Sequence, residues 1–111
     1  MRRKKGKAID IIKLIWEENE KDADGFATKK EHITEAYCKE KSVTRAEAYG
    51  AMWAGVSVQA VFEIRQEDWE ETGHTVNGIT EYARKAEHGG RRFDIKRTYK
   101  IGKSKIEVVC G

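Results

Sequence analysis

Residues 91–110 constrain the fold of this chain most strongly, because they form two runs of alternating apolar and polar residues around a short turn. The first run places four side chains on one face: Phe93, Ile95, Tyr99 and Ile101. The second run does the same with Ile106, Val108 and Cys110. A period of two is typical of a strand with one buried side. The turn at 101–104 is short enough to join the runs as an antiparallel hairpin, so a mainly-β domain is expected.

Four more strands are predicted upstream, at 8–17, 30–41, 56–65 and 79–88. The clearest is 56–65, whose apolar residues recur at every second position: Val56, Val58, Ala60, Phe62 and Ile64. A helix remains an alternative for 8–17, because Ile11, Leu14 and Ile15 also have helical spacing. Two polar stretches between these segments are predicted loops: 17–25 and 66–78.

One short helix is predicted at about 45–54, where alanines are frequent. Thr44 and Glu47 have the spacing of a capping box, and Gly55 stands where a C-terminal cap is expected. Gly50 is the one unfavourable residue within the segment. Three large side chains would pack this helix on the sheet, an interpretation favoured over a ligand pocket: Tyr49, Met52 and Trp53.

The charge of the chain is unevenly distributed. The net charge is +3, but five basic residues precede the first acid: Arg2, Arg3, Lys4, Lys5 and Lys7. Residues 8–111 therefore carry a formal charge of −2, which is +3 less +5. The expected organisation is a basic, flexible tail at 1–7 and a single slightly acidic domain at 8–111, since 111 residues suffice for one core.

The sequence contains no pattern that indicates an enzyme. The three histidines, His32, His74 and His88, are far apart and lack the short spacing of zinc ligands. No nucleophile elbow and no glycine-rich phosphate loop occurs. Cys38 and Cys110 are isolated, so free thiols are expected rather than a disulfide, in keeping with folding in a cytoplasm. No apolar run has the length of a membrane span or a signal-peptide core.

One stretch resembles the calcium loop of an EF-hand. Its candidate ligands are Glu20, Asp22, Asp24 and Glu31, with Gly25 at the turn position. Two features weaken a calcium site: the first position is Glu rather than the shorter Asp, and the flanking segments are predicted strands rather than helices. A solvated hairpin loop is the favoured interpretation, and neither a metal nor a cofactor is expected.

The basic tail offers possible DNA contacts through Arg2, Arg3, Lys4, Lys5 and Lys7. The strength of such a contact would depend on salt but not on the DNA sequence. A tail that keeps the protein soluble is the more frequent role of such a run. A small OB-like nucleic-acid-binding module is the alternative function for the whole chain. It would need basic and aromatic residues together on one strand face, whereas the aromatic residues fall mostly on predicted inward faces.

The order of several motifs resembles the head–tail joining proteins (head-closure, stopper or adaptor proteins) of tailed bacteriophages. In chain order the motifs are Asp24-Gly25, the step from Ser42 to Glu47, Phe62-Glu63-Ile64-Arg65, Gly90-Arg91-Arg92-Phe93-Asp94-Ile95 and Ile106-Glu107-Val108-Val109-Cys110. The resemblance covers nearly the whole chain from about residue 8. One departure is the long connection at 69–77, where the family has a brief turn.

The resemblance implies a small antiparallel β-barrel of about six strands with one short α-helix. It implies a virion protein, made in the bacterial host cytoplasm and encoded by a phage or prophage, that assembles as a ring below the portal and its adaptor. Such a ring closes the DNA-filled head, lets the packaged DNA pass and presents a docking surface to tail proteins. No catalysis and no membrane is implied.

If the chain forms a ring, its loops and edge strands must supply the subunit contacts. The candidate segments are 17–29, 42–55 and 66–78. Within 42–55, the interface or channel candidates are Thr44, Arg45, Glu47, Tyr49, Met52 and Trp53.

Overall fold

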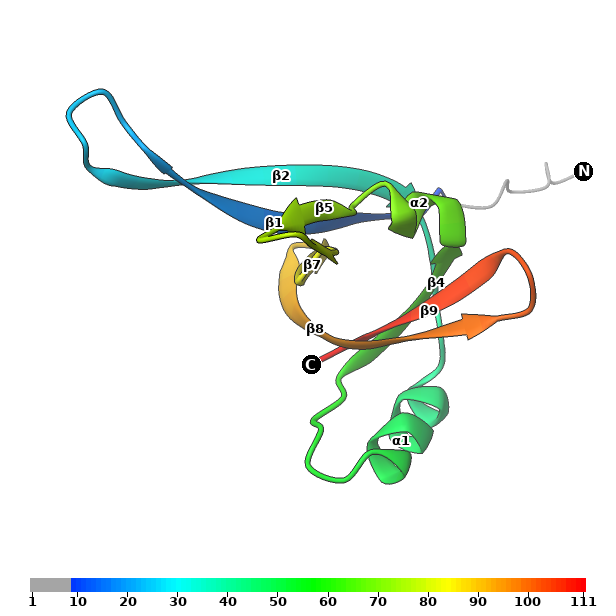
Figure 1. Cartoon of the computed structure of the whole chain (residues 1–111). Helices are drawn as coiled ribbons and strands as arrows, with labels where there is room; N and C mark the ends of the chain where they lie inside the picture. The colour runs from blue at the N-terminus through cyan, green and yellow to red at the C-terminus, as the bar shows by residue number, and fades with distance from the viewer. Residues whose placement is uncertain (1–8) are drawn as a thin grey trace, which may run out of the picture.

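The computed structural model describes residues 9–111, which form nine strands and two helices (Figure 1). The strands are β1 (Ile11–Lys21), β2 (Ala27–Tyr37), β3 (Lys39–Glu40), β4 (Ala60–Arg65), β5 (His74–Val76), β6 (Ile79–Glu81), β7 (Lys85–His88), β8 (Arg91–Ile101) and β9 (Lys105–Cys110). The helices are α1 (Val43–Met52) and α2 (Gln66–Glu70). The mainly-β class is confirmed, with more strands and one more helix than predicted. The predicted basic tail at 1–7 lies outside the described residues.

Seven strands form one sheet in the order β2-β1-β7-β8-β9-β4-β3, and every pair in it is antiparallel. The hairpin β5–β6 forms a separate two-stranded sheet. Among the described residues, the hydrogen-bonded order is open, with β2 and β3 as its edges, so a closed barrel is not found. The two edge strands are nevertheless consecutive in the chain, with only Cys38 between them.

Apolar side chains cover both faces of the sheet around β4 and β9. Phe62 and Val108 belong to the larger, central cluster, whereas Val61 and Val109 belong to a smaller one beneath α1. The central cluster consists of Ile12, Leu14, Ala36, Ala60, Phe62, Ile64, Trp69, Ala83, Ala86, Phe93, Ile106, Val108 and Cys110. The predicted alternation is thus confirmed in both strands, although β4 begins at Ala60 rather than at Val56. Full burial of each large apolar side chain stabilises the fold by roughly 1.5–3 kcal/mol.

Side chains of strand β8 contact both clusters because the strand contains a bulge. The register with β9 shifts between Ile95 and Arg97, which leaves Lys96 as the additional residue. One extra residue turns every following side chain to the opposite face. Phe93 and Ile95 therefore contact the central cluster, whereas Tyr99 packs edge-on against Tyr49 of α1 at a centroid distance of 6.1 Å. The prediction that all four apolar residues of this run share one face is wrong for this reason.

Strands β1 and β2 extend into the polar segment that was predicted as a loop. Their pairing continues from Ile11↔Tyr37 to Lys21↔Ala27. The turn between them is short, and the Asp22 carboxylate stabilises it by accepting from the backbone N–H groups of Asp24 and Phe26 at 2.9 and 2.8 Å. This carboxylate replaces backbone partners that the turn would otherwise lack.

The acidic connection at 66–78 also contains regular structure that was not predicted. The Arg65 guanidinium binds both oxygens of Asp68 in the first turn of α2, at 3.1 and 3.0 Å, and Trp69 buries its ring against Tyr82. The predicted strand at 79–88 is divided into β6 and β7, because the backbone N–H of Ala83 donates to the buried Thr72 hydroxyl rather than to a neighbouring strand.

Helix α1 begins two residues earlier than predicted. Its N-cap is Ser42, whose hydroxyl accepts from the backbone N–H of Arg45 at 3.2 Å, so the predicted capping box at Thr44 is wrong. Its C-cap is Trp53, whose backbone N–H donates to the Tyr49 carbonyl at 3.0 Å, so the predicted cap at Gly55 is wrong. Gly55 lies two residues beyond this cap with a φ of +82°, the left-handed conformation that glycine adopts without strain. Tyr49 is buried against the sheet as expected, whereas Met52 is 63% exposed and does not pack there.

Candidate functional site

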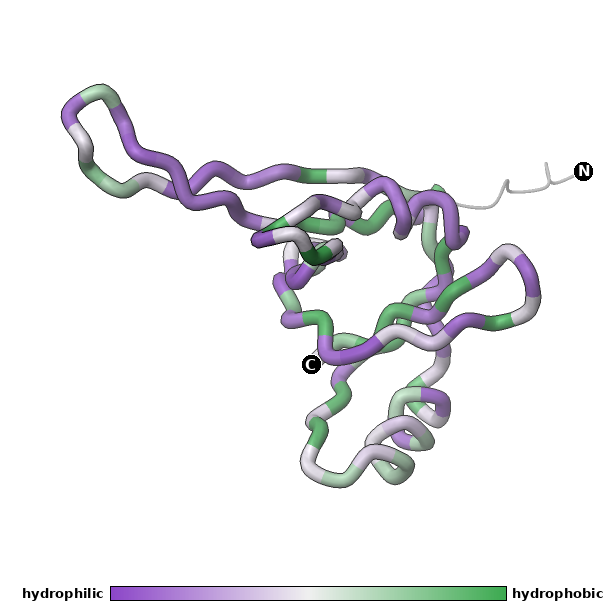
Figure 2. Tube along the Cα trace, viewed as in Figure 1, coloured by the Kyte–Doolittle hydropathy of each residue, from purple (hydrophilic) through white to green (hydrophobic). Residues whose placement is uncertain are grey.

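The distal half of the β1–β2 hairpin projects from the sheet as an arm, defined here as residues 17–31 (Figure 1). Strand β7 pairs with β1 only from Lys13 to Ile15, so no third strand among the described residues lies beside the arm. All of its residues are exposed. Figure 2 shows that the arm is mostly hydrophilic, in contrast to the apolar segments of β4 and β9. A two-stranded ribbon of this kind is marginally stable in water unless something packs on it.

The tip of the arm carries one large apolar side chain among charged ones. Phe26 is 69% exposed. An ion pair joins the strands near the base, where the Lys29 ammonium lies 3.9 Å from the Glu17 carboxylate. Aromatic residues in a polar surround are typical of the anchors that bind partner proteins.

The calcium candidates lie on the arm but do not converge on one point. Asp22 is engaged in the turn, and Glu31 lies four residues into β2, where its carboxylate accepts from Arg92 of β8 at 2.9 Å. Glu20 pairs across the ribbon with Thr28. Since the flanking elements are strands, the two helices of an EF-hand are not present around this loop. This structure does not support the resemblance of Glu20, Asp22, Asp24 and Glu31 to a calcium loop.

A buried ion pair anchors α1 to the sheet. Glu107 of β9 is 1% exposed, and one of its oxygens accepts from Arg45 Nε and Nη2 at 3.1 and 3.0 Å and from the Tyr49 hydroxyl. The Lys41 ammonium lies 4.0 Å from the other oxygen. Burial, and next the hydrogen bond to Glu107, raise the pKa of Tyr49 to about 12. The guanidinium, the hydroxyl and the ammonium satisfy a buried carboxylate that would otherwise be costly.

The six interface candidates of α1 and its C-cap divide into two sets of three. Arg45, Tyr49 and Trp53 face the sheet; the Trp53 ring stacks on Tyr49 and lies 5.1 Å beneath the Arg97 guanidinium. Their role is to hold the helix. The other three are exposed to solvent and available to a partner: Thr44, Glu47 and Met52.

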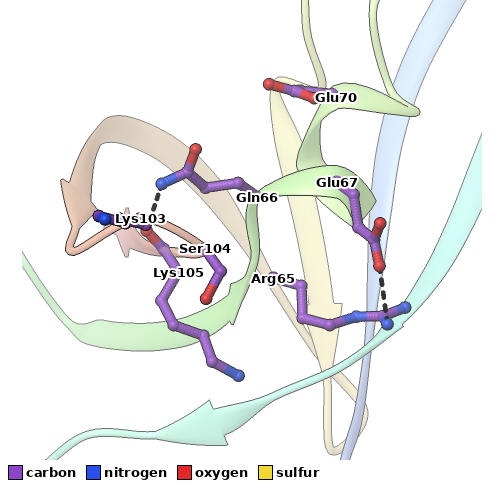
Figure 3. Close-up of a pocket in the computed structure, with 7 residues that line it drawn as sticks. All are labelled: Arg65, Gln66, Glu67, Glu70, Lys103, Ser104 and Lys105. Carbon is purple, nitrogen blue, oxygen red and sulfur yellow. Dashed lines mark hydrogen bonds and ion pairs between the residues drawn. The ribbon is translucent and has the colours of Figure 1, made fainter.

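A shallow polar pocket lies where α2 meets the β8–β9 turn (Figure 3). It is lined by Arg65, Gln66, Glu67, Glu70, Lys103, Ser104 and Lys105. Its groups are largely engaged with one another, since the Gln66 amide donates to the Lys105 carbonyl at 3.0 Å and the Arg65 guanidinium lies 2.8 Å from Glu67. Cations and carboxylates are mixed along its wall, so it has no evident preference for a charged ligand.

Three residues that are far apart in the sequence also lie close together in the structure. Asp10, Cys38 and His88 place one ligand-type atom each within 4.8 Å of the other two. His88 Nε2 lies 2.7 Å from Asp10 Oδ1, although the two residues are 78 positions apart. Spacing along the chain could not reveal this cluster, because each member comes from a different strand or strand end.

The three histidines all pack on aromatic rings. Trp16 lies between the imidazoles of His32 and His74, with ring centroids 3.9 and 3.6 Å apart. His88 packs on Phe62 at 4.7 Å.

Cys38 is half-buried beside the Asp10 carboxylate. Burial, and next the charge of Asp10, raise the pKa of the Cys38 thiol to about 12. A thiol of this kind is protonated at neutral pH and is a poor nucleophile. The cluster therefore does not resemble the activated cysteine of a thiol enzyme.

Comparison with protein-family models found no match, and comparisons with curated proteins and with solved structures found no significant match. Neither of the two described helices is long and apolar enough to cross a membrane.

Proposed function

We propose that this chain is a structural subunit of a tailed-bacteriophage head–tail connector. In this proposal, copies of the chain assemble as a ring below the portal and its adaptor, close the DNA-filled head and present a docking surface to the tail. The chain performs no reaction of its own. It is made in the host cytoplasm and incorporated into the virion.

The arm is the structural feature on which this proposal rests. A solvated ribbon with no third strand gains stability when a neighbouring subunit adds contacts or a strand to it. Because β2 is also an edge strand of the sheet formed by residues 9–111, its outer backbone groups can pair with another chain. Phe26 at the tip supplies the apolar anchor for such a contact.

The sheet order supports the barrel that the family resemblance implies. The two edge strands, β2 and β3, are joined through a single residue, Cys38, and the Cys38 N–H donates to the Asp10 carbonyl at 2.9 Å. We propose that the curved sheet acts as a barrel-like body, from which the arm and α1 project toward neighbouring subunits.

The charge of the domain is compatible with a DNA channel. Residues 8–111 carry a formal charge of −2. An acidic wall repels phosphates and lets DNA slide through the ring rather than bind to it. The same charge argues against the OB-like alternative, which needs a basic surface.

The decisive experiment adds the purified chain to a portal–adaptor complex and images the product by electron microscopy. A ring of added density below the adaptor is expected. A variant in which a two-residue turn replaces residues 20–28 should keep the thermal midpoint of the body but lose this binding. The matched point variant is Phe26→Ser, with Ile79→Ser as the control, because Ile79 is 65% exposed on the separate β5–β6 hairpin.

Three outcomes would contradict the proposal. The first is the absence of binding to the portal–adaptor complex. The second is DNA binding that falls steeply with salt and survives removal of residues 1–7, which would indicate the nucleic-acid-binding module. The third is a thermal shift with calcium that Asp22→Ala removes, which would indicate a calcium-binding loop.

A further inference from the structure

The cluster of Asp10, Cys38 and His88 has the composition and proximity of a metal centre. We propose that these three residues bind a zinc ion, through a carboxylate oxygen, the thiolate sulfur and Nε2 of the imidazole. Their ligand atoms already lie within 4.8 Å of one another. Ligand atoms around tetrahedral zinc are roughly 3.5 Å apart, so small side-chain rotations complete the site. The proposal does not depend on the connector function.

The backbone fixes the relative positions of the three residues. Cys38 donates its N–H to the Asp10 carbonyl at 2.9 Å, which holds the junction of β2 and β3 beside the start of β1. The pairing of Lys13 with Glu87 then brings the end of β7 to the same place. Phe62 packs against the His88 imidazole and limits its rotation. The ligands are therefore held by the fold rather than by a flexible loop.

The donor set selects the class of ion. Thiolate and imidazole are the ligands that zinc prefers, and they bind calcium and magnesium poorly. A carboxylate and a thiolate together balance the two charges of the ion, and the imidazole ligates in its neutral form. The zinc ion takes the place of the thiol proton and of the hydrogen bond between His88 and Asp10. With three protein ligands, the fourth position is open to water or to a group of a partner.

The position of the cluster gives such an ion a structural role. Cys38 lies between β2 and β3, the two edges of the open sheet, whereas Asp10 precedes β1 and His88 ends β7. An ion bound here links both edges of the sheet to its middle. Because it binds the folded state only, it raises the midpoint of thermal unfolding.

The test uses the full chain after treatment with a chelator. Cobalt(II) is titrated as a spectroscopic substitute for zinc, and zinc itself is titrated by calorimetry. The expected result is a cobalt–thiolate charge-transfer band in the near ultraviolet, which zinc abolishes by displacing cobalt. The midpoint of thermal unfolding should rise with zinc but not with calcium.

Matched variants locate the ion. Cys38→Ser should abolish the charge-transfer band, whereas Cys110→Ala, at the buried cysteine outside the cluster, should retain it. Loss of an outer-shell partner alone typically costs 10–100-fold in metal affinity, so Asp10→Asn is expected to weaken zinc binding by more than about tenfold. His32→Asn is the control for His88→Asn, since the His32 imidazole bonds to Glu18 outside the cluster.

Several results would overturn the proposal. One is a wild-type chain that shows no charge-transfer band with cobalt. Another is zinc binding that is as strong in Cys38→Ser and Asp10→Asn as in the wild-type chain. If a variant fails to fold, as judged by its far-ultraviolet circular dichroism, the wild-type cobalt spectrum still decides the question.

Discussion

Arg45 and Glu107 are joined by two hydrogen bonds that converge on one carboxylate oxygen, at 3.1 and 3.0 Å. The pair ties the first turn of α1 to the middle of β9 across the smaller apolar cluster. Glu107 is 1% exposed, whereas the Arg45 side chain is 42% exposed. The carboxylate thus depends on the arginine, while the arginine retains some contact with water.

Arg45→Met is expected to lower the free energy of unfolding by about 2 kcal/mol, because it removes the main partner of a buried charge. The loss stays below that of a fully buried pair, since Arg45 is partly solvated and Lys41 remains near the carboxylate. Urea unfolding at neutral pH measures the effect. The control is Arg84→Met, which breaks an exposed pair with Glu81 and should cost under about 0.5 kcal/mol. Equal effects of the two substitutions would contradict the anchoring role of Arg45.

The Tyr49 hydroxyl is expected to make stability fall in alkali. Its pKa is raised to about 12 in the folded chain, against about 10 in the unfolded chain. The stabilisation is therefore complete below pH 10 and is lost as the pH rises toward 12, by roughly 1.4 kcal/mol per pH unit. The advantage of wild type over Tyr49→Phe should be present at pH 8 and shrink by pH 11. Denaturant unfolding at the two pH values tests this, and a constant difference would refute it.

Gly50→Ala is expected to stabilise the chain by about 0.5–1 kcal/mol. Gly50 lies inside α1, and a Cβ added there meets no atom within 4 Å. The paired substitution is Gly55→Ala, which should destabilise the chain by about 1 kcal/mol because Gly55 has a φ of +82°. Thermal unfolding of the two variants should therefore shift in opposite directions. Shifts of the same sign would show that α1 does not end as described.

Trp16→Ala is expected to release the β5–β6 hairpin from the main sheet. Among the described strands, the hairpin pairs with no other, and the stack of Trp16 on His74, with centroids 3.6 Å apart, attaches it to β1. Amide hydrogen exchange should lose protection in β5 and β6, with a loss of about 3 kcal/mol in overall stability. His32→Ala removes only the opposite face of the stack and should leave hairpin protection intact. Equal loss in both variants would contradict this account.

The C-terminal hairpin could be predicted from the sequence because the central face of β9 is continuously apolar. Ile106, Val108 and Cys110 alternate without interruption and lie in one cluster. The bulge in β8 could not be predicted, because its apolar residues keep a period of two on both sides of Lys96. Only the pairing partner shows that Tyr99 faces α1 rather than the central cluster.

The arm and the metal-type cluster were missed for different physical reasons. Residues 17–25 are polar and solvated, and the strands of the arm are held by backbone pairing rather than by an apolar face, so composition indicated a loop there. The cluster of Asp10, Cys38 and His88 depends on how three strand ends meet in space. No local pattern in the sequence carries that information.

The extra residue in β8 also determines how the chain tolerates changes in length. Removing Lys96 would leave the pairs Ile95↔Cys110, Arg97↔Val109 and Tyr99↔Glu107 in place as an unbroken ladder, so Tyr99 would still face α1. Removing a residue from the regular part of the strand that follows, such as Thr98, would instead exchange inner for outer residues along the rest of it. Insertions at the tip of the arm should be accommodated far more readily, so natural length variation is expected to concentrate there.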